Sequence, residues 1–302
     1  MRLSFVWWNT ALSPTVKKDR ATVTQRVVAA QLIEMMATSL DADVICLGEV
    51  SAKDIASMRS DWEAQGFAIR EGVSRAGRSY FDTCVLYKKS KLFVLADTDL
   101  TSVKGTSTLK VGQRIDFGLC DNETVLHLFV SHWPSQQWCY ENHADRHLLG
   151  MRLRDAIEEV GVSSGETHVV VLGDFNDEPF AKSLSSQLMA TRDRYLAANK
   201  AHLLYNPFWR HMGEELPYTS EHIGRQYGGS YYYSGDLTDK WRTFDQIMFS
   251  SSFLGKTEWH LREDLVRILN VRDYTNFVLD EEHNFDHLPV VGVIEKKATQ
   301  HD

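Results

Sequence analysis

Short apolar runs recur along the chain, and most of them end on a polar residue. The first run, Leu3–Trp8, is followed by Asn9 and predicts a strand. A second run, Val44–Leu47, ends on Gly48 and Glu49 and is again short enough for a strand. These runs are continuous rather than alternating, which is typical of strands that are buried on both faces.

Two longer segments, residues 22–39 and 142–160, carry apolar side chains at helical spacing. Further strands are predicted within residues 81–89, 91–97, 123–132, 167–174, 243–250 and 285–294. The first two of these are expected to pair as a hairpin. Strands and helices therefore interleave, and we expect an α/β fold in which sheets pack face to face with helices outside.

The segment His168–Phe180 changes character at Gly173, where a strand gives way to a cluster of polar residues. A turn is one explanation, because Gly, Asp and Asn favour turns. A metal or phosphate site is the other, since Asp174 and Asn176 point to one side in an extended chain. The acids and proline of residues 177–179 predict the start of a helix.

Polar residues that can bind a metal or a phosphate lie at the ends of several predicted strands: Asn9, Glu49, His132, Asp174, Asn176, Asp245, Asp286 and His287. Taken singly, each has an ordinary explanation as a turn former or a solvated side chain. Asp245 is different, because a carboxylate inside an apolar strand needs a partner. His287 is the candidate, since an Asp–His pair fixes the imidazole tautomer and raises its basicity.

Six motifs follow one another along the chain: WWN, GEV, SHW, LGDFND, FDQI and FDHLPV. In this order they resemble the motifs of the endonuclease/exonuclease/phosphatase superfamily, which has the DNase I-like and exonuclease III-like fold. The resemblance implies a four-layer α/β/β/α sandwich of two mixed β-sheets flanked by helices. It also implies one domain over residues 1–295, followed by a solvated tail over residues 296–302.

The resemblance further implies a role for each matched residue. The residues that would hold the metal are Asn9, Glu49 and Asp286. The residues that would carry the catalysis are His132, Asp174, Asn176, Asp245 and His287. Mg²⁺ or Mn²⁺ is the expected cofactor, because hard cations prefer oxygen ligands and the chain has neither CxxC nor HExxH spacing for zinc.

Two features depart from the family pattern. At the third motif, Ser131-His132-Trp133 stands in place of the Tyr-containing motif of exonuclease III-like enzymes. Gly48 stands where a glutamine commonly precedes the metal-binding glutamate. One further polar residue of the family has three candidates here, Arg78, Tyr80 and Asp82. The general base also stays open between His287 and Asp174.

The charge and the cysteine content bear on the possible partners and the cellular location of the protein. The formal net charge of -8 gives no global basic field for nucleic acid. The four cysteines have no CxxC spacing, and Cys46 and Cys84 lie in apolar runs, so we expect buried free thiols and a cytoplasmic, reducing location. No apolar run is long enough for a signal peptide or a bilayer span. Oligomeric state is left open.

Nine aromatic residues lie between His202 and Trp241, in a stretch that either covers a core edge or forms a substrate wall. Trp209, Tyr231 and Trp241 are the predicted substrate-binding residues. The first expectation is a metal-dependent nuclease with nucleic acid as substrate. A phosphatase or phosphodiesterase acting on a small molecule or lipid headgroup is the alternative, favoured by the acidic net charge. A binding protein on an inactive scaffold is a third hypothesis.

Overall fold

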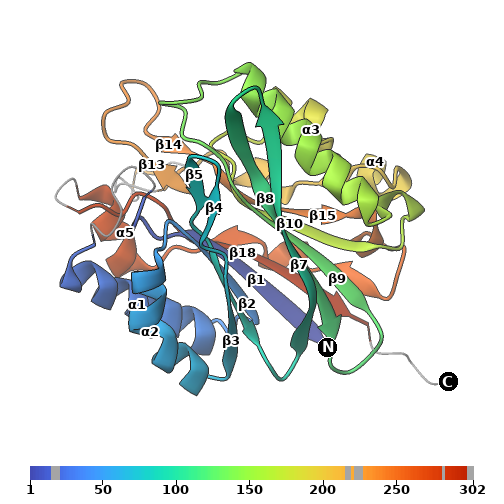
Figure 1. Ribbon diagram of the computed structural model, residues 1–302, viewed down its shortest axis with the longest axis horizontal. Helices are drawn as coiled ribbons and strands as arrows, with labels where there is room; N and C mark the ends of the chain where they lie inside the picture. Colours follow the sequence, from blue (N-terminus) through green and yellow to red (C-terminus); the bar gives the residue numbers. More distant parts are fainter. Residues whose placement is uncertain (15–20, 215–218, 221–226, 281–282, 298–302) are drawn as a thin grey trace.

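A computed structural model describes the fold over residues 1–14, 21–214, 219–220, 227–280 and 283–297. Two seven-stranded sheets pack against each other, with α1 and α2 on one side of the assembly and α3 and α4 on the opposite side (Figure 1). Each sheet contains both parallel and antiparallel pairs. The predicted α/β/β/α sandwich is confirmed.

The first sheet places the first and last strands at its centre. Its strands, in spatial order, are β16 (Trp259–Leu261), β18 (Val290–Lys296), β1 (Arg2–Asn9), β2 (Val44–Gly48), β6 (Cys84–Lys88) and β3 (Phe67–Glu71), with β17 (Arg267–Ile268) beside β18. The predicted strands at residues 3–8 and 44–47 are confirmed, each with a slight extension.

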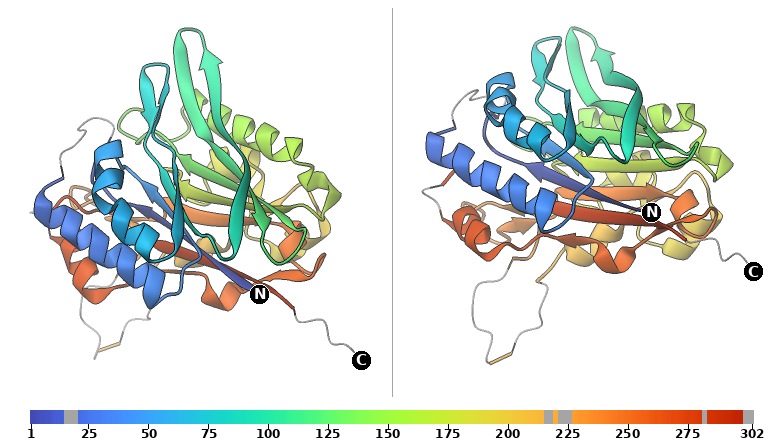
Figure 2. Two further views of the ribbon diagram at one scale, coloured as in Figure 1. Left: turned by 60° about the horizontal axis from the view of Figure 1, so that its bottom comes forward. Right: turned by 90° about the horizontal axis from the view of Figure 1, so that it is seen from below.

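The second sheet places β10 between a parallel and an antiparallel neighbour. Its strands, in spatial order, are β11 (Ala190–Thr191), β12 (Leu204–Tyr205), β15 (Asp245–Ser250), β10 (His168–Asp174), β9 (Val125–His132), β8 (Ser107–Leu119) and β7 (Leu92–Lys104). Two small ribbons complete the strands: β4 (Ser74–Ala76) with β5 (Ser79–Phe81), and β13 (Tyr231–Tyr232) with β14 (Trp241–Arg242). The β4–β5 ribbon and the long β7–β8 hairpin project beyond the sheets (Figure 2).

The α-helices are α1 (Val23–Thr38), α2 (Ala52–Ala64), α3 (Ala144–Glu159), α4 (Arg194–Asn199) and α5 (Arg272–Leu279). Thr22 begins α1 with a capping box that includes Gln25, which satisfies backbone N–H groups at the helix start. The two predicted long helices are therefore confirmed. No helix in the described ranges is long and apolar enough to cross a membrane.

Strand β10 shows why a continuous apolar run forms here. Val170 and Leu172 belong to the core between the sheets, whereas Val169 and Val171 belong to a second core beneath α3. Each fully buried side chain of this size contributes about 1.5–3 kcal/mol to folding. Burial on both faces therefore fixes this strand between the two sheets' shared core and the helix layer. Cys46 and Cys84 are also buried, as expected, and all four cysteines are free thiols.

The expected hairpin between residues 81–89 and 91–97 is wrong. Strand β6 pairs with β2 and β3 in the first sheet, whereas β7 pairs with β8 in the second. The chain crosses between the two sheets at Lys89–Lys91. A short polar turn can connect two strands of one hairpin or two strands of different sheets. The sequence of the turn therefore does not reveal that β6 and β7 belong to different sheets.

The helix expected to begin at residues 177–179 is also absent there: the next helical segment is a single π-helical turn, Ser183–Gln187. The two acids make tertiary contacts instead. Asp177 accepts a hydrogen bond from Ser183 and lies 3.5 Å from the guanidinium of Arg146. Glu178 accepts one from the amide of Thr243. Of the expected tail, Lys296 lies in β18 and residues 298–302 are outside the described ranges.

Candidate active site

The polar strand ends meet because the sheet registers align them. Asn9 at the end of β1 is the register partner of Gly48 at the end of β2. In the other sheet, Asp174 at the end of β10 is the partner of both His132 and Asp245. Parallel strands end at one edge, and antiparallel β15 begins there, so residues far apart in sequence share that edge.

His287 is fixed by two neighbours from different strands. Its Nδ1 lies 2.7 Å from Oδ2 of Asp245, and the indole N–H of Trp7 donates to Oδ1 of Asp245 at 2.7 Å. All three side chains are buried. Burial alone would lower the pKa of His287, but the carboxylates of Asp245, Asp174 and Asp286 raise it to about 10. The pair expected from sequence is present.

Asp174 lies at the centre of the cluster. Its Oδ2 accepts from Nδ2 of Asn9 at 3.2 Å and lies 3.7 Å from Nε2 of His287 and 3.9 Å from Nε2 of His132. Its Oδ1 accepts from the backbone N–H of Asn176 at 2.8 Å. One carboxylate therefore connects four of the predicted site residues.

His132 is held by a carboxylate that the sequence left as one of three candidates. Its Nδ1 lies 3.1 Å from Oδ1 of Asp82, which also forms an ion pair with Lys110 at 3.2 Å. Burial opposes ionisation of Asp82, but His132 and Lys110 hold its pKa well below the usual range. Burial likewise opposes protonation of His132, and Asp82 outweighs it, so the pKa of His132 is raised.

Glu49 and Asp286 complete an acidic side of the site. Burial raises the pKa of Glu49 to about 7; His132 opposes this effect, and the carboxylates of Asp286 and Asp82 add to it. Glu49 Oε1 is 4.0 Å from Nε2 of His132, and the Asp286 side chain is 43% exposed. A bound cation would stabilise the charged form of Glu49, which burial and the neighbouring carboxylates disfavour.

Two glycines permit this packing. At Gly173 (φ 152°), a Cβ would lie 1.8 Å from the carbonyl oxygen of Ser131 on the neighbouring strand, so no other residue fits before Asp174. At Gly48, a Cβ would lie 2.7 Å from Cη2 of Trp7. The Trp7 ring therefore takes the space beside residue 48, and a glutamine there would displace the indole that binds Asp245.

The loops that follow β9 and β10 are tied together by buried hydrogen bonds. Asn176 has a φ of 49° and donates from Nδ2 to the carbonyl of Trp133. Arg146 is fully buried and donates to the carbonyls of Pro134, Cys139 and Phe175. These contacts fix the loop positions that present His132 and Asn176.

The three predicted substrate-binding aromatics lie at different distances from this cluster. The Tyr231 ring is 4.7 Å from the His287 ring and stacks on Phe244 at 5.2 Å. Trp241 packs on Tyr232 and lines a neighbouring cavity. Trp209 belongs neither to the cluster around Asp174 nor to the lining of this cavity. The guanidinium of Arg192 lies 4.7 Å from the centroid of its ring.

Three residues that support the site were not predicted from the sequence as site residues: Trp7, Lys110 and Tyr274. The Tyr274 hydroxyl donates to the carbonyl of His287 at 2.8 Å and accepts from the indole of Trp8. Trp7 and Trp8 looked like ordinary core residues because they lie in an apolar run. No local signal marks their indole N–H groups as hydrogen-bond donors to the site.

Comparison with known proteins identifies the family. The sequence profile described as Endonuclease/Exonuclease/phosphatase family matches residues 21–271, which is most of the chain. The chain belongs to the Endonuclease/Exonuclease/phosphatase family. This confirms the resemblance drawn from the six motifs and makes the protein a member of a family of phosphoester hydrolases. A search of curated protein sequences found no match.

Solved structures of the Endonuclease/Exonuclease/phosphatase family share the fold at low sequence identity. The human Nocturnin catalytic domain with bound sulfate has a TM-score of 0.63 and 13% identity, covering 98% of this chain and 95% of that one. TDP2 of D. rerio with a single-strand DNA product has a TM-score of 0.60 and 14% identity, covering 98% and 99%. The Bacteroides thetaiotaomicron mannosyl-6-phosphatase has a TM-score of 0.59 and 15% identity, covering 97% and 99%.

Proposed function

We propose that this protein is a divalent-metal-dependent phosphoester hydrolase, and that it is a nuclease cleaving phosphodiester bonds by water attack. The observation that carries the proposal is the cluster around Asp174, in which Asn9, His132 and His287 all lie within 3.9 Å of its Oδ2. A buried carboxylate surrounded by two imidazoles and an amide suits the binding and activation of a phosphoester.

Asn9, Glu49 and Asp286 are the residues that we assign to Mg²⁺ or Mn²⁺. Asp174, Asp245 and His287 also offer ligand atoms within 4.8 Å of one another. Asp245 is already engaged by Trp7 and His287 at 2.7 Å, which leaves it poorly suited to a metal. A bound dication would polarise the phosphoryl group and stabilise the leaving oxygen.

The remaining residues position the reaction. Asp174 would take the proton from the attacking water, or His287, oriented by Asp245, would do so in its neutral form. The carboxylates that raise the pKa of His287 favour its protonated form, which donates a proton rather than accepting one. Removing a general base typically costs about 10²–10⁴-fold in rate. His132 and Asn176 would donate hydrogen bonds to the phosphoryl oxygens. Asp82 fixes the orientation of His132 through Nδ1, which leaves Nε2 directed toward Asp174 and Glu49.

Support for a nuclease comes from the β4–β5 ribbon. It carries Arg75 and Arg78 and ends directly before Asp82, so two guanidinium groups lie on the segment that leads into the site. Such groups bind phosphates of a nucleic acid backbone. TDP2 was solved with a single-strand DNA product, which agrees with this reading.

A phosphatase or phosphodiesterase acting on a small molecule is the second candidate. It is favoured by the acidic side chains of Glu141, Glu178 and Asp239 around the neighbouring cavity, which would repel a polyanion. The mannosyl-6-phosphatase of Bacteroides thetaiotaomicron has the same fold, which agrees with this candidate.

The test is hydrolysis of labelled single- and double-stranded DNA in the presence of Mg²⁺ or Mn²⁺, with His287→Ala as the control. Cleavage by the wild type that is lost in the variant supports the nuclease. Folded protein without cleavage of DNA, but with turnover of phosphomonoesters or small phosphodiesters, supports the second candidate. Activity on any of these that persists in excess chelator contradicts the metal dependence, and no activity on any of them favours a binding protein.

A further inference from the structure

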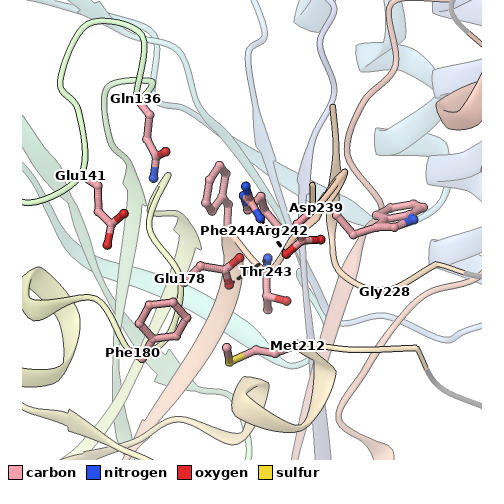
Figure 3. A pocket seen from close by; sticks show the side chains of 11 residues that line it. Gln136, Glu141, Glu178, Phe180, Met212, Gly228, Asp239, Arg242, Thr243 and Phe244 are labelled. Carbon is pink, nitrogen blue, oxygen red and sulfur yellow. Dashed lines mark hydrogen bonds and ion pairs between the residues drawn. The ribbon is translucent and has the colours of Figure 1, made fainter. Parts of the chain in front are cut away.

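The neighbouring cavity, with a volume of about 270 Å³, holds none of the groups assigned above to catalysis or to the metal (Figure 3). Phe180, Trp241 and Phe244 supply its aromatic lining, and Glu178 and Asp239 supply carboxylates. Ligand pockets for drug-sized molecules have volumes of roughly 300–1,000 Å³, so this cavity has room for about one ring.

Two of the lining residues connect the cavity directly to the site. Gln136 donates from Nε2 to the carbonyl of Asn176 at 3.0 Å. The ring of Phe244 stacks on Tyr231 at 5.2 Å, and Tyr231 lies 4.7 Å from the ring of His287. The Phe244 ring, which lines the cavity, therefore lies within about 10 Å of the His287 ring, a span that the organic group of a phosphoester can cover.

The charges of the cavity define what it can bind. Among its described lining residues, Arg242 is the basic one, and its two terminal nitrogens lie 2.7 Å from carboxylates of Asp236 and Asp239. Glu141 and Glu178 add acidic groups, and Figure 3 shows both among the side chains that line the cavity. A second phosphate would meet carboxylates here, whereas hydroxyl or amino donors would find acceptors.

Glu178 is placed to serve as such an acceptor. Its Oε2 accepts from the backbone N–H of Thr243 at 3.2 Å, which fixes the carboxyl group between the Phe180 and Phe244 sides of the cavity. Aromatic faces combined with carboxylate acceptors suit a flat or puckered ring that carries polar hydrogens.

We propose that this cavity binds the organic group attached to the scissile phosphate, and that this group is an uncharged ring bearing hydroxyl or amino donors. A sugar and a nucleoside share this chemistry. The inference rests on the proposed phosphoester hydrolysis and adds the substrate class to it. Glu178 and Asp239 are the residues that would select the ring.

The test compares kcat/KM on three substrates with Mg²⁺ or Mn²⁺: bis(para-nitrophenyl) phosphate, which has no donors, a hexose phosphate and a dinucleotide. Glu178→Gln keeps an acceptor for the Thr243 amide but removes the charge. We expect it to lower kcat/KM on the preferred donor-bearing substrate by about 10- to 100-fold relative to the donor-free one, as for loss of a hydrogen bond to a charged group. Asp239→Asn provides a second variant, and Glu34→Gln on α1 is the matched control.

The outcomes distinguish a failure of the cavity assignment from a failure of the proposed hydrolase function. Preference for the hexose phosphate identifies a sugar, and preference for the dinucleotide identifies a nucleoside. Turnover of bis(para-nitrophenyl) phosphate with an unchanged substrate ratio in both variants overturns the cavity assignment and leaves the hydrolase intact. If folded, metal-loaded wild type hydrolyses none of the three, the proposed function fails and the cavity assignment fails with it.

Discussion

His287 and Asp245 are joined by a hydrogen bond of 2.7 Å between Nδ1 and Oδ2, although they are 42 positions apart in the chain. Trp7 donates to the second oxygen of the same carboxylate. The imidazole is thus held by Asp245 at the start of β15, which Trp7 of β1 supports in turn, and its other nitrogen, Nε2, faces Asp174 at 3.7 Å.

Replacing His287 or Asp174 by alanine is expected to lower kcat by about 10²–10⁴-fold, because each variant removes a candidate for the general base. Circular dichroism and a cooperative unfolding transition should show that both variants fold. His147→Ala, a substitution in α3, is the histidine control. Near-normal turnover in both site variants would falsify the assignment of this cluster.

Removing the charge of Glu49 is expected to weaken metal binding. We expect Glu49→Gln to raise the Mn²⁺ concentration for half-maximal activity by about 10- to 100-fold, comparable with the loss of groups that support a metal site. The melting temperature of the wild type should also rise with added Mn²⁺, since a ligand that binds only the folded state stabilises it. Equal metal dependence in wild type and variant would show that Glu49 is not a ligand.

Gly48→Ala is expected to disturb the site through Trp7. A Cβ at this position would lie 2.7 Å from the indole ring, and overpacking of this kind costs about 1–3 kcal/mol of stability. Activity should fall as well, because the displaced indole no longer supports Asp245. Among the residues that the structure describes, a Cβ at Gly213 meets no atom within 4 Å, so Gly213→Ala is the matched control. Unchanged stability and activity in both variants would show that Trp7 shifts freely.

Arg146→Met is expected to lower the free energy of unfolding by about 3–5 kcal/mol, since it leaves buried carbonyls and the carboxylate of Asp177 without their partner. Chemical denaturation measures the loss. The control, Arg152→Met, lies on the same helix in an exposed ion pair with Asp155 and should change stability by less than about 1 kcal/mol. Similar effects of both substitutions would contradict the role of Arg146 in fixing the two loops.

His168 is expected to make stability depend on pH. Burial lowers its pKa to about 4, and the charge of His127 acts in the same direction, whereas a histidine in the unfolded chain titrates near 6.5. The unfolded state therefore binds more protons between these values, so the stabilisation present above pH 6.5 is lost as the pH falls toward 4.

Denaturation at several pH values tests this dependence. Wild type should lose up to about 3 kcal/mol more than His168→Gln over this range, on the basis of 1.36 kcal/mol per pKa unit. Other titrating groups contribute equally to both proteins, so the difference isolates this histidine. Parallel stability curves would show that the pKa of His168 is the same in the folded and unfolded states.

The sequence predicted the sheets and the strand-end residues because each depends on a local pattern. Apolar runs such as that of β10 identify strands, and polar residues such as Asn9 and Asp174 at their ends indicate a shared edge. Pairing was harder, because the turn after β6 reads as a hairpin although its flanking strands enter different sheets. The role of Trp7 was hidden for a similar reason: its partner lies in another strand.

Because β1 pairs with β18, the first sheet and the site can be completed only after β18 has been synthesised. β1 is synthesised long before β18, yet β18 is one of its two neighbours in the sheet, and His287 lies just before that strand in the sequence. Long-range pairing of this kind slows folding, because loop closure precedes the contacts that stabilise it. A nascent chain that lacks β18 therefore cannot have an assembled site, which keeps hydrolytic activity out of partly synthesised protein.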